Sequence, residues 1–413
     1  MTGVSRRAVL LGALVGGGVI AGCSGRPDQS RETPGPAATT APSVTSRRVD
    51  FQGTTYDVPE RARRIVTLGD ACLQPALDLA APVVATTAVA PAVVPPSRRA
   101  ALRALPVVGS GRADDPVNPA DVLEHDPDLV LATEDTDRRL VDELGARLPV
   151  VVVRTSGEHR RDWQARVRGL ADVLGSDRAP ALRRQYEERT AGIRRVHRDV
   201  LASTRVVVLR AWDPTRITAY GPQSVIGAIY SDAGVTFVPA VQSSREGRAK
   251  ATTAAPSTTS PNGAASPSPS ALAAPGEFPG TLADVGRYLA GAGVIMLASD
   301  YAGGLDAFTG GSLANSDAVR GYVREHDAIM RGAGVLAMTS YAQVDFVLDQ
   351  LDSALADAAA RADAPSAPTA AGLTAAEGWW ASVASSPATA SRSREEPCSQ
   401  GFDACDGVVG ACL

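Results

Sequence analysis

The sequence predicts an α/β protein in which two lobes of mainly parallel β-sheet are joined by one long helix. Short, continuous apolar runs alternate with amphipathic helical patterns from about residue 64 to residue 153, and the alternation restarts at residue 205. Between these stretches, residues 176–203 carry apolar side chains at three- and four-residue steps, with arginines and glutamates between them. We therefore expect two Rossmann-like lobes connected by a single amphipathic helix.

We call residues 176–203 the linking helix. Ser176 is its predicted N-cap, and Pro180 fits its first turn. About 26 helical residues span roughly 39 Å, enough to connect two small domains. An ordinary surface helix of one larger domain is the alternative. The predicted apolar face consists of Leu182, Tyr186, Ile193, Val196 and Val200.

The start of the chain carries the most specific local signal. Arg6 and Arg7 form a twin-arginine pattern, and the apolar stretch that follows is too short and glycine-rich to span a membrane. Ile20-Ala21-Gly22 then precedes Cys23, which resembles a bacterial lipobox. The resemblance implies cleavage before Cys23 and diacylation of its thiol, which would anchor an exported protein to the outer face of the membrane. A cleaved secretory peptide followed by a buried cysteine is the alternative, and the export route stays open.

Composition divides the remainder of the chain into ordered and low-complexity segments. Both low-complexity segments after the tether are rich in Ser, Ala and Pro or Thr, and we expect them to be disordered. The last segment contains Cys398, Cys405 and Cys412, whose spacing matches no zinc site, so its role stays open. The predicted divisions are a signal peptide (1–22), a tether from the lipidated cysteine (23–47), a first lobe (48–175), the linking helix (176–203), a second lobe (204–360) with an insert (243–275), and a tail (361–413).

Within the lobes, apolar runs and helical periodicity predict individual elements. A β-hairpin is expected at 49–59, with its turn at Gln52-Gly53. Further strands are expected at 64–69, 82–87, 105–109, 126–132, 148–153, 205–209, 293–298 and 334–338. Helices are expected at 72–80, 119–125, 138–147, 163–174, 224–233, 282–289, 319–326 and 344–360.

Composition argues against several classes of function. The net charge is −4, and it becomes −6 once Arg6 and Arg7 are removed with the signal peptide (−4 − 2), so we expect no nucleic-acid partner. The 4 histidines are scattered without metal-ligand spacing, and neither a phosphate loop nor a Ser-His-Asp constellation can be inferred. We therefore expect no catalytic residues, no metal site and no cofactor. Cys72 is expected to be a small buried thiol.

Several segments, in order, resemble the helical-backbone substrate-binding proteins of iron–siderophore, haem and cobalamin ABC importers, most closely the actinobacterial type. These are the hairpin and strand from Gly53 to Leu68, the segment Asn118–Ala132 with its Pro-Asp-Leu strand, the linking helix, Ala219-Tyr220-Gly221 and Ala328–Val335. The match covers about residues 48–360. The resemblance implies a monomeric, non-enzymatic protein that binds a chelated metal between its lobes and docks on a permease.

In such a fold, ligands bind between the lobes, near the carboxyl ends of the strands. The candidates in the first lobe are Asp70, Arg112, Glu134 and Asp135, and those in the second are Arg210, Trp212, Tyr220, Asp300 and Tyr301. Ferric siderophores are large, partly apolar and often anionic, so aromatic faces and guanidinium groups suit them. We therefore predict that the ligand-binding residues are Arg112, Arg210, Trp212, Tyr220 and Tyr301.

The resemblance also implies one docking acid on each lobe, opposite arginines of the permease. Asp121 and Asp284 lie one residue from the aligned positions, which are occupied by Ala120 and Val285. Such acids favour register and encounter more than affinity. The alternative is structural, because both acids lie in a helical first turn, where the dipole favours a carboxylate.

These observations predict a lipid-anchored protein that captures a ferric siderophore and delivers it to an ABC importer. Haem or cobalamin is the alternative ligand, with Tyr220 or Tyr301 as the axial haem ligand. An envelope-maintenance or interaction lipoprotein that keeps the fold without transport is the alternative of a different class.

Overall fold

The computed structural model describes residues 45–109, 116–242, 274–301, 313–334, 336 and 338–363. The described residues belong to one compact unit. The predicted signal peptide with Cys23, Arg112, most of the insert and the tail cysteines lie outside them. In the part of the chain that is described, no helix is long and apolar enough to cross a membrane.

The chain enters the fold through the expected hairpin. Strand β1 (Ser46–Phe51) pairs antiparallel with β2 (Thr54–Pro59), and the turn residues Gln52 and Gly53 have φ of 49° and 77°. Two successive positive φ values are typical of the turns that match the twist of a hairpin. The hairpin packs on helix α5 (Trp163–Leu174), where the ring of Phe51 leaves room only for a glycine at 169.

The first sheet is entirely parallel, with strand order β4-β3-β5-β6. Alternate residues of its strands face two separate cores, one shared with α1 and α5 and the other with α3 and α4. The expected strand at 105–109 is wrong, since only Val107 forms an isolated bridge, to Thr86. The elements are β3 (Ile65–Leu68), α1 (Asp70–Asp78), β4 (Val83–Thr86), α2 (Arg99–Ala104), α3 (Pro119–Leu123), β5 (Leu129–Thr133), α4 (Arg138–Gly145) and β6 (Val150–Val153), with 3₁₀ turns η1 (Pro91–Val93), η2 (Pro96–Arg98) and η3 (Gly157–Arg160).

The second sheet is mixed, with order β10-β8-β7-β11-β12 and the short β9 beside β7. Strands β7, β9, β11 and β12 are parallel, whereas β8 and β10 form an antiparallel edge. The expected strand at 334–338 is wrong, because the pairing residues are Ile329–Gly334. This edge strand tolerates Arg331 since its guanidinium donates to Asp357. The strands are β7 (Arg205–Ala211), β8 (Arg216–Tyr220), β9 (Thr236–Phe237), β10 (Glu277–Thr281), β11 (Val294–Ala298) and β12 (Ile329–Gly334).

Helices surround the second sheet at the expected places. Helix α13 packs along β12, and α10 packs against α12. The fold class predicted from the sequence is confirmed: the protein is α/β, with two lobes of mainly parallel sheet. The remaining elements are α8 (Val225–Asp232), η4 (Pro239–Val241), η6 (Leu282–Asp284), α10 (Val285–Leu289), α12 (Asp317–His326) and α13 (Tyr341–Asp363).

The linking helix is interrupted. Helix α6 (Ala179–Val196) stops at His197, whose φ and ψ are −104° and 25°, and the short α7 (Arg198–Ser203) follows. The prediction of one continuous helix is therefore wrong, as are the N-cap role of Ser176 and the buried position of Val196. The Ser176 hydroxyl donates to Leu79 O instead, and Val196 is 71% exposed. Pro180 does lie in the first turn.

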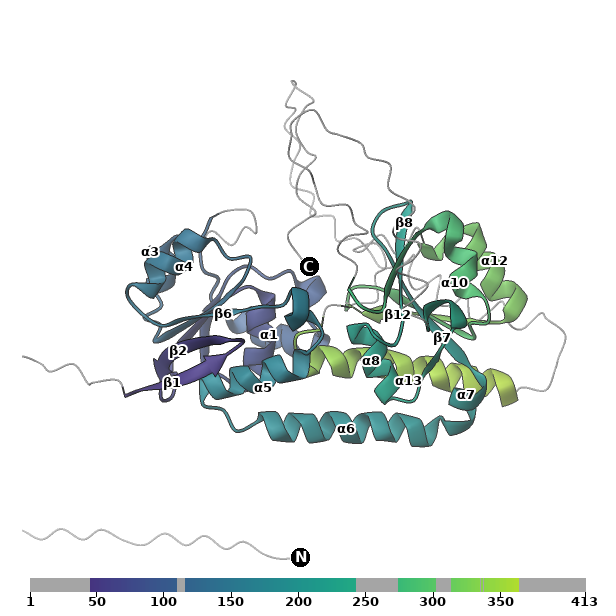
Figure 1. Ribbon diagram of the computed structural model, residues 1–413, viewed down its shortest axis with the longest axis horizontal. Helices are drawn as coiled ribbons and strands as arrows, with labels where there is room; N and C mark the ends of the chain where they lie inside the picture. The colour runs from purple at the N-terminus through teal and green to yellow at the C-terminus, as the bar shows by residue number, and fades with distance from the viewer. Residues whose placement is uncertain are drawn as a thin grey trace, which may run out of the picture. The chain divides into compact units, whose positions relative to one another are not determined.

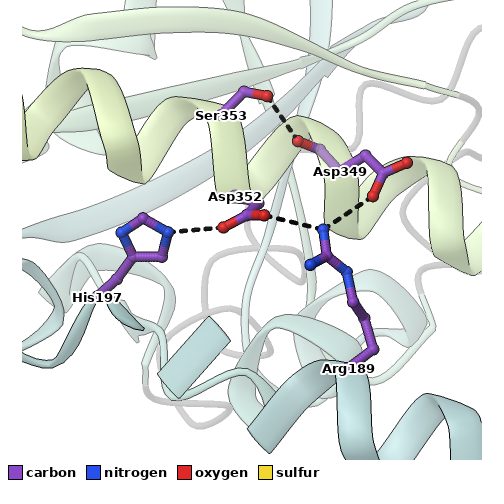
Figure 2. Close-up of polar contacts among 5 residues, drawn as sticks. All are labelled: Arg189, His197, Asp349, Asp352 and Ser353. Atoms are coloured by element: carbon purple, nitrogen blue, oxygen red, sulfur yellow. Dashed lines mark hydrogen bonds and ion pairs between the residues drawn. The ribbon is translucent and has the colours of Figure 1, made fainter. Parts of the chain in front are cut away.

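A polar cluster explains this break. Figure 1 shows α6 and α13 running side by side, and Figure 2 shows the side chains that join them. Arg189 donates to Asp349 and Asp352 at 2.9 Å each, and His197 Nε2 donates to Asp352 Oδ1 at 2.6 Å. The buried imidazole is thus bound to α13 at the residue where the backbone leaves the helical path.

Buried polar contacts also join the two lobes. The Asp78 carboxylate at the end of α1 accepts hydrogen bonds from Arg98 (2.7 Å) and from the backbone N–H of Tyr341, the first residue of α13. The Arg166 guanidinium of α5 donates to Met338 O at 2.9 Å. The ring of Trp163 packs edge-on against Tyr341, with 4.8 Å between centroids. The entry to α13 is thus bound to the first lobe by charge, hydrogen bonds and aromatic packing.

The Asp352 contacts predict a stability difference that depends on pH. Burial opposes ionisation, but hydrogen bonds from His197 and Arg189 outweigh it and lower the pKa of Asp352. The folded pKa is then below the unfolded one, so this stabilisation is present above about pH 4 and lost as pH falls through the folded value. Asp352→Asn should lower the free energy of unfolding by about 1–2 kcal/mol at neutral pH.

Urea unfolding of wild type and variant, between neutral pH and about pH 3, measures this difference. Asp142→Asn is the matched control, since Asp142 forms an i,i+4 pair with Arg138 whose side chains are 65% and 89% exposed. Its effect should stay below about 0.5 kcal/mol. An Asp352→Asn deficit that persists unchanged in acid would contradict the assignment.

Candidate functional site

Alternate residues of three strands gather polar and aromatic side chains on one face of the second sheet. In the antiparallel register, Arg210 of β7 is opposite Thr218 of β8, and Tyr220 of β8 is opposite Glu277 of β10. Residues two apart along a strand share a face, so Arg210 and Trp212 lie on the same side as these partners. We call Arg210, Trp212, Thr218, Tyr220 and Glu277 the polar strip.

Arg210 and Trp212 lie at one end of the polar strip, where a guanidinium group contacts an aromatic ring. The Arg210 guanidinium lies 3.7 Å from the centroid of the Trp212 ring, a cation–π contact. The indole N–H donates to Thr218 Oγ1 at 2.9 Å, which fixes the ring, and 37% of Trp212 remains exposed. Burial lowers the pKa of Arg210, whereas Tyr220 and Glu277 favour the charged form. The strip therefore presents an oriented aromatic surface beside a buried cation.

Tyr220 is almost fully buried at the end of β8. Burial, together with the negative charge of Glu277, raises the pKa of Tyr220 to about 12. Its hydroxyl is therefore protonated at neutral pH and can donate a hydrogen bond to a ligand oxygen. The same shift disfavours the phenolate that would serve as an axial haem ligand.

Arg160 of η3, which follows the last strand of the first sheet, connects the first lobe to the polar strip. Its Nη2 lies 2.8 Å from Glu277 Oε1, and the two side chains are 40% and 11% exposed. Burial raises the pKa of Glu277, while Arg160 opposes that shift. Sequence reasoning missed both residues. Arg160 follows a strand, so the rule that gave the other candidates points to it, whereas nothing in the sequence marks Glu277.

The predicted acids all lie just past strands, and Glu134 has structural partners. Glu134 Oε1 accepts hydrogen bonds from Thr155 N and Oγ1, at 2.9 and 3.1 Å, and so connects the segments that follow β5 and β6. Burial alone would raise the pKa of Glu134, but these hydrogen bonds outweigh it, so the pKa is lowered. Asp70 begins α1 directly after β3, where burial raises the pKa of its carboxyl group. Asp135 and Asp300 also follow strands, as expected.

Tyr301 lies at a second contact between the lobes, apart from the polar strip. Its backbone N–H donates to Ala92 O of the first lobe at 3.1 Å, and its ring packs edge-on against Phe346 with 4.9 Å between centroids. Only 1% of the residue is exposed, and its hydroxyl makes no hydrogen bond within the described part of the chain. Its ligand-binding role stays a prediction, as does that of Arg112, which lies outside the described residues.

Asp121 and Asp284 occupy equivalent places in the two lobes. Each occupies the N3 position of a capping box. Asp121 Oδ2 accepts from Asn118 N at 3.4 Å, and Asp284 Oδ2 accepts from Thr281 Oγ1 at 2.9 Å. Each capped turn precedes a buried strand, β5 in one lobe and β11 in the other. The two lobes thus repeat one local arrangement, and both acids stabilise helix starts.

The buried thiol expected at Cys72 is confirmed. Burial raises the pKa of this thiol well above its usual range, so it remains protonated and unreactive. Within the described ranges, no group of three or more His, Cys, Asp or Glu side chains could bind a metal ion.

No family model matches the chain, and no curated protein is significantly similar to it in sequence. Solved structures, in contrast, share its fold. The siderophore periplasmic binding protein from the fuscachelin gene cluster of Thermobifida fusca is 20% identical with a TM-score of 0.53, over 73% of this chain and 98% of that one. A FhuD fold-family periplasmic binding protein component of a ferrichrome ABC transporter from Bacillus subtilis is 15% identical with a TM-score of 0.50, over 71% and 97%.

The protein therefore has the two-lobed fold of these periplasmic binding proteins. At such low identity, the similarity establishes the fold and leaves the ligand to be argued from the site. The resemblance drawn from the sequence is confirmed at this level.

Proposed function

We propose that the protein is a lipid-anchored, exported substrate-binding protein that captures a ferric siderophore between its lobes and delivers it to an ABC importer. The observation that carries this proposal is the contact of Arg210 with the partly exposed Trp212 ring at the carboxyl end of β7. A guanidinium binds the oxygens of an iron chelate, and the indole packs on its apolar backbone. The fold is shared with proteins described as siderophore-binding.

Calorimetric titration with ferric hydroxamate, catecholate and carboxylate chelates, and with haem and cobalamin, tests the proposal. We expect one ferric chelate to bind with a Kd below about 1 µM. Trp212→Ala should weaken that binding by about tenfold or more, because it removes the stacking surface and releases Arg210.

Arg205→Ala is the matched control, since Arg205 begins the same strand at its exposed end. This variant should bind like wild type. A folded protein that binds none of the chelates would contradict the siderophore assignment and favour an envelope-interaction lipoprotein. Saturable binding of haem or cobalamin alone would redirect the assignment to that ligand.

We also propose that Cys23 bears the lipid anchor. Expressed in a bacterium that processes lipoproteins, the full chain should fractionate with membranes, whereas Cys23→Ser should be released because the diacyl group is lost. Cys398→Ser is the control, and it should remain with the membranes. Retention of the Cys23→Ser protein in the membrane fraction would rule out this anchor.

Docking on the permease through Asp121 and Asp284 completes the proposal. Asp121→Asn with Asp284→Asn removes both charges while keeping an oxygen that can accept the capping hydrogen bonds. Association with the reconstituted importer should fall about tenfold, with chelate affinity unchanged, because rim charges act on the encounter. Importer association that equals wild type, with only the unfolding temperature reduced, would assign both acids to helix capping alone.

A further inference from the structure

The ion pair between Arg160 and Glu277 joins two lobes at the edge of the polar strip. Arg160 ends η3, and Glu277 begins β10, directly opposite Tyr220 in the β8–β10 register. The separation of 2.8 Å makes this a specific contact, and the 11% exposure of the Glu277 side chain shows that its carboxylate is largely removed from water, whereas Arg160 is 40% exposed. The negative charge of Glu277 therefore acts on the cations near which a ligand on the polar strip would bind.

Glu277 is flanked by two guanidinium groups. Its carboxylate contacts Arg160 directly, and its charge also acts on Arg210, whose pKa it helps to raise against burial. The like charges of Arg160 and Arg210 act on each other as well. A carboxylate between two cations occupies the electrostatic position that anionic oxygens of a ligand would otherwise take.

We propose that Glu277 sets the charge preference of the ligand site by acting as an internal counter-ion to Arg160 and Arg210. The inference rests on the proposed function, because it assumes that an iron chelate binds at the polar strip. A strongly anionic chelate must displace Glu277 from Arg160 and remain close to a like charge. A neutral chelate neither displaces Glu277 nor is repelled by it.

The proposal names a class of ligand. Three hydroxamate groups, each with a single negative charge, neutralise a ferric ion, whereas three doubly charged catecholates leave the complex strongly anionic. Glu277 therefore favours a neutral chelate of the trihydroxamate type over a trianionic chelate of the tricatecholate type. This preference arises from repulsion of the competing ligand as much as from attraction of the preferred one.

The experiment compares the affinities of a neutral ferric trihydroxamate and a trianionic ferric tricatecholate, measured by calorimetry with the full folded chain at fixed salt. In Glu277→Gln, the ratio of tricatecholate to trihydroxamate affinity should rise by about tenfold or more relative to wild type, because a nearby like charge is removed. Raising the salt concentration should shrink this change. Glu188→Gln is the matched control, since Glu188 is exposed on α6, and it should leave the ratio unaltered.

Arg160→Gln is the reciprocal variant, and it keeps the inference testable if Glu277→Gln folds poorly. It removes the cation that contacts Glu277 directly and leaves only Arg210 nearby, so the same ratio should fall. If Glu277 only fastened the lobes together, both variants would weaken both chelates by equal factors, and the unchanged ratio would overturn the inference while leaving the proposed function intact. If wild type binds a ferric carboxylate but neither of these two chelates, this inference fails and the proposed function stands. If it binds no ferric chelate at all, both fail.

Discussion

The buried carboxylate of Asp78 is the contact on which the arrangement of the lobes depends. A carboxylate removed from water requires compensating partners, and Asp78 has the Arg98 guanidinium and backbone N–H groups at the start of α13. Its own helix belongs to the first lobe, whereas α13 packs along the second sheet. Because separation from α13 would leave one carboxylate oxygen of Asp78 without its hydrogen bonds in the interior, the entry to α13 stays attached to α1.

The polar strip follows from strand geometry alone. Side chains two residues apart share a face, and the register of β7, β8 and β10 aligns those positions across three strands. A site built in this way is rigid, because each side chain is oriented by backbone pairing before any ligand arrives. The hydrogen bond from Trp212 to Thr218 adds to this rigidity by fixing the indole ring.

Sequence reasoning succeeded where local chemistry decides the structure. Gln52-Gly53 predicts its own hairpin turn, and continuous apolar runs predict the parallel strands. Sequence-based prediction failed where the local structure contacts residues far away in the chain. The helix breaks at His197, which bonds to Asp352, 155 residues away, and the edge strand Ile329–Gly334 contains Arg331, whose charge is matched by Asp357. Arg210, Trp212 and Tyr220 were predicted because they follow or end expected strands. Glu277 is placed beside them by a strand register that no local pattern encodes.

The contacts between the lobes differ in how readily they exchange partners. The side chain of Asp78 is wholly buried, and the contact of Arg166 with Met338 O is also buried, so breaking either costs the full desolvation of a charged group. Arg160 is 40% exposed, so water can replace Glu277 at this contact at smaller cost. Of these three contacts, the one between Arg160 and Glu277 therefore costs least to break. Under the proposed function, a change in lobe separation on ligand binding would begin at the polar strip and leave the entry to α13 attached.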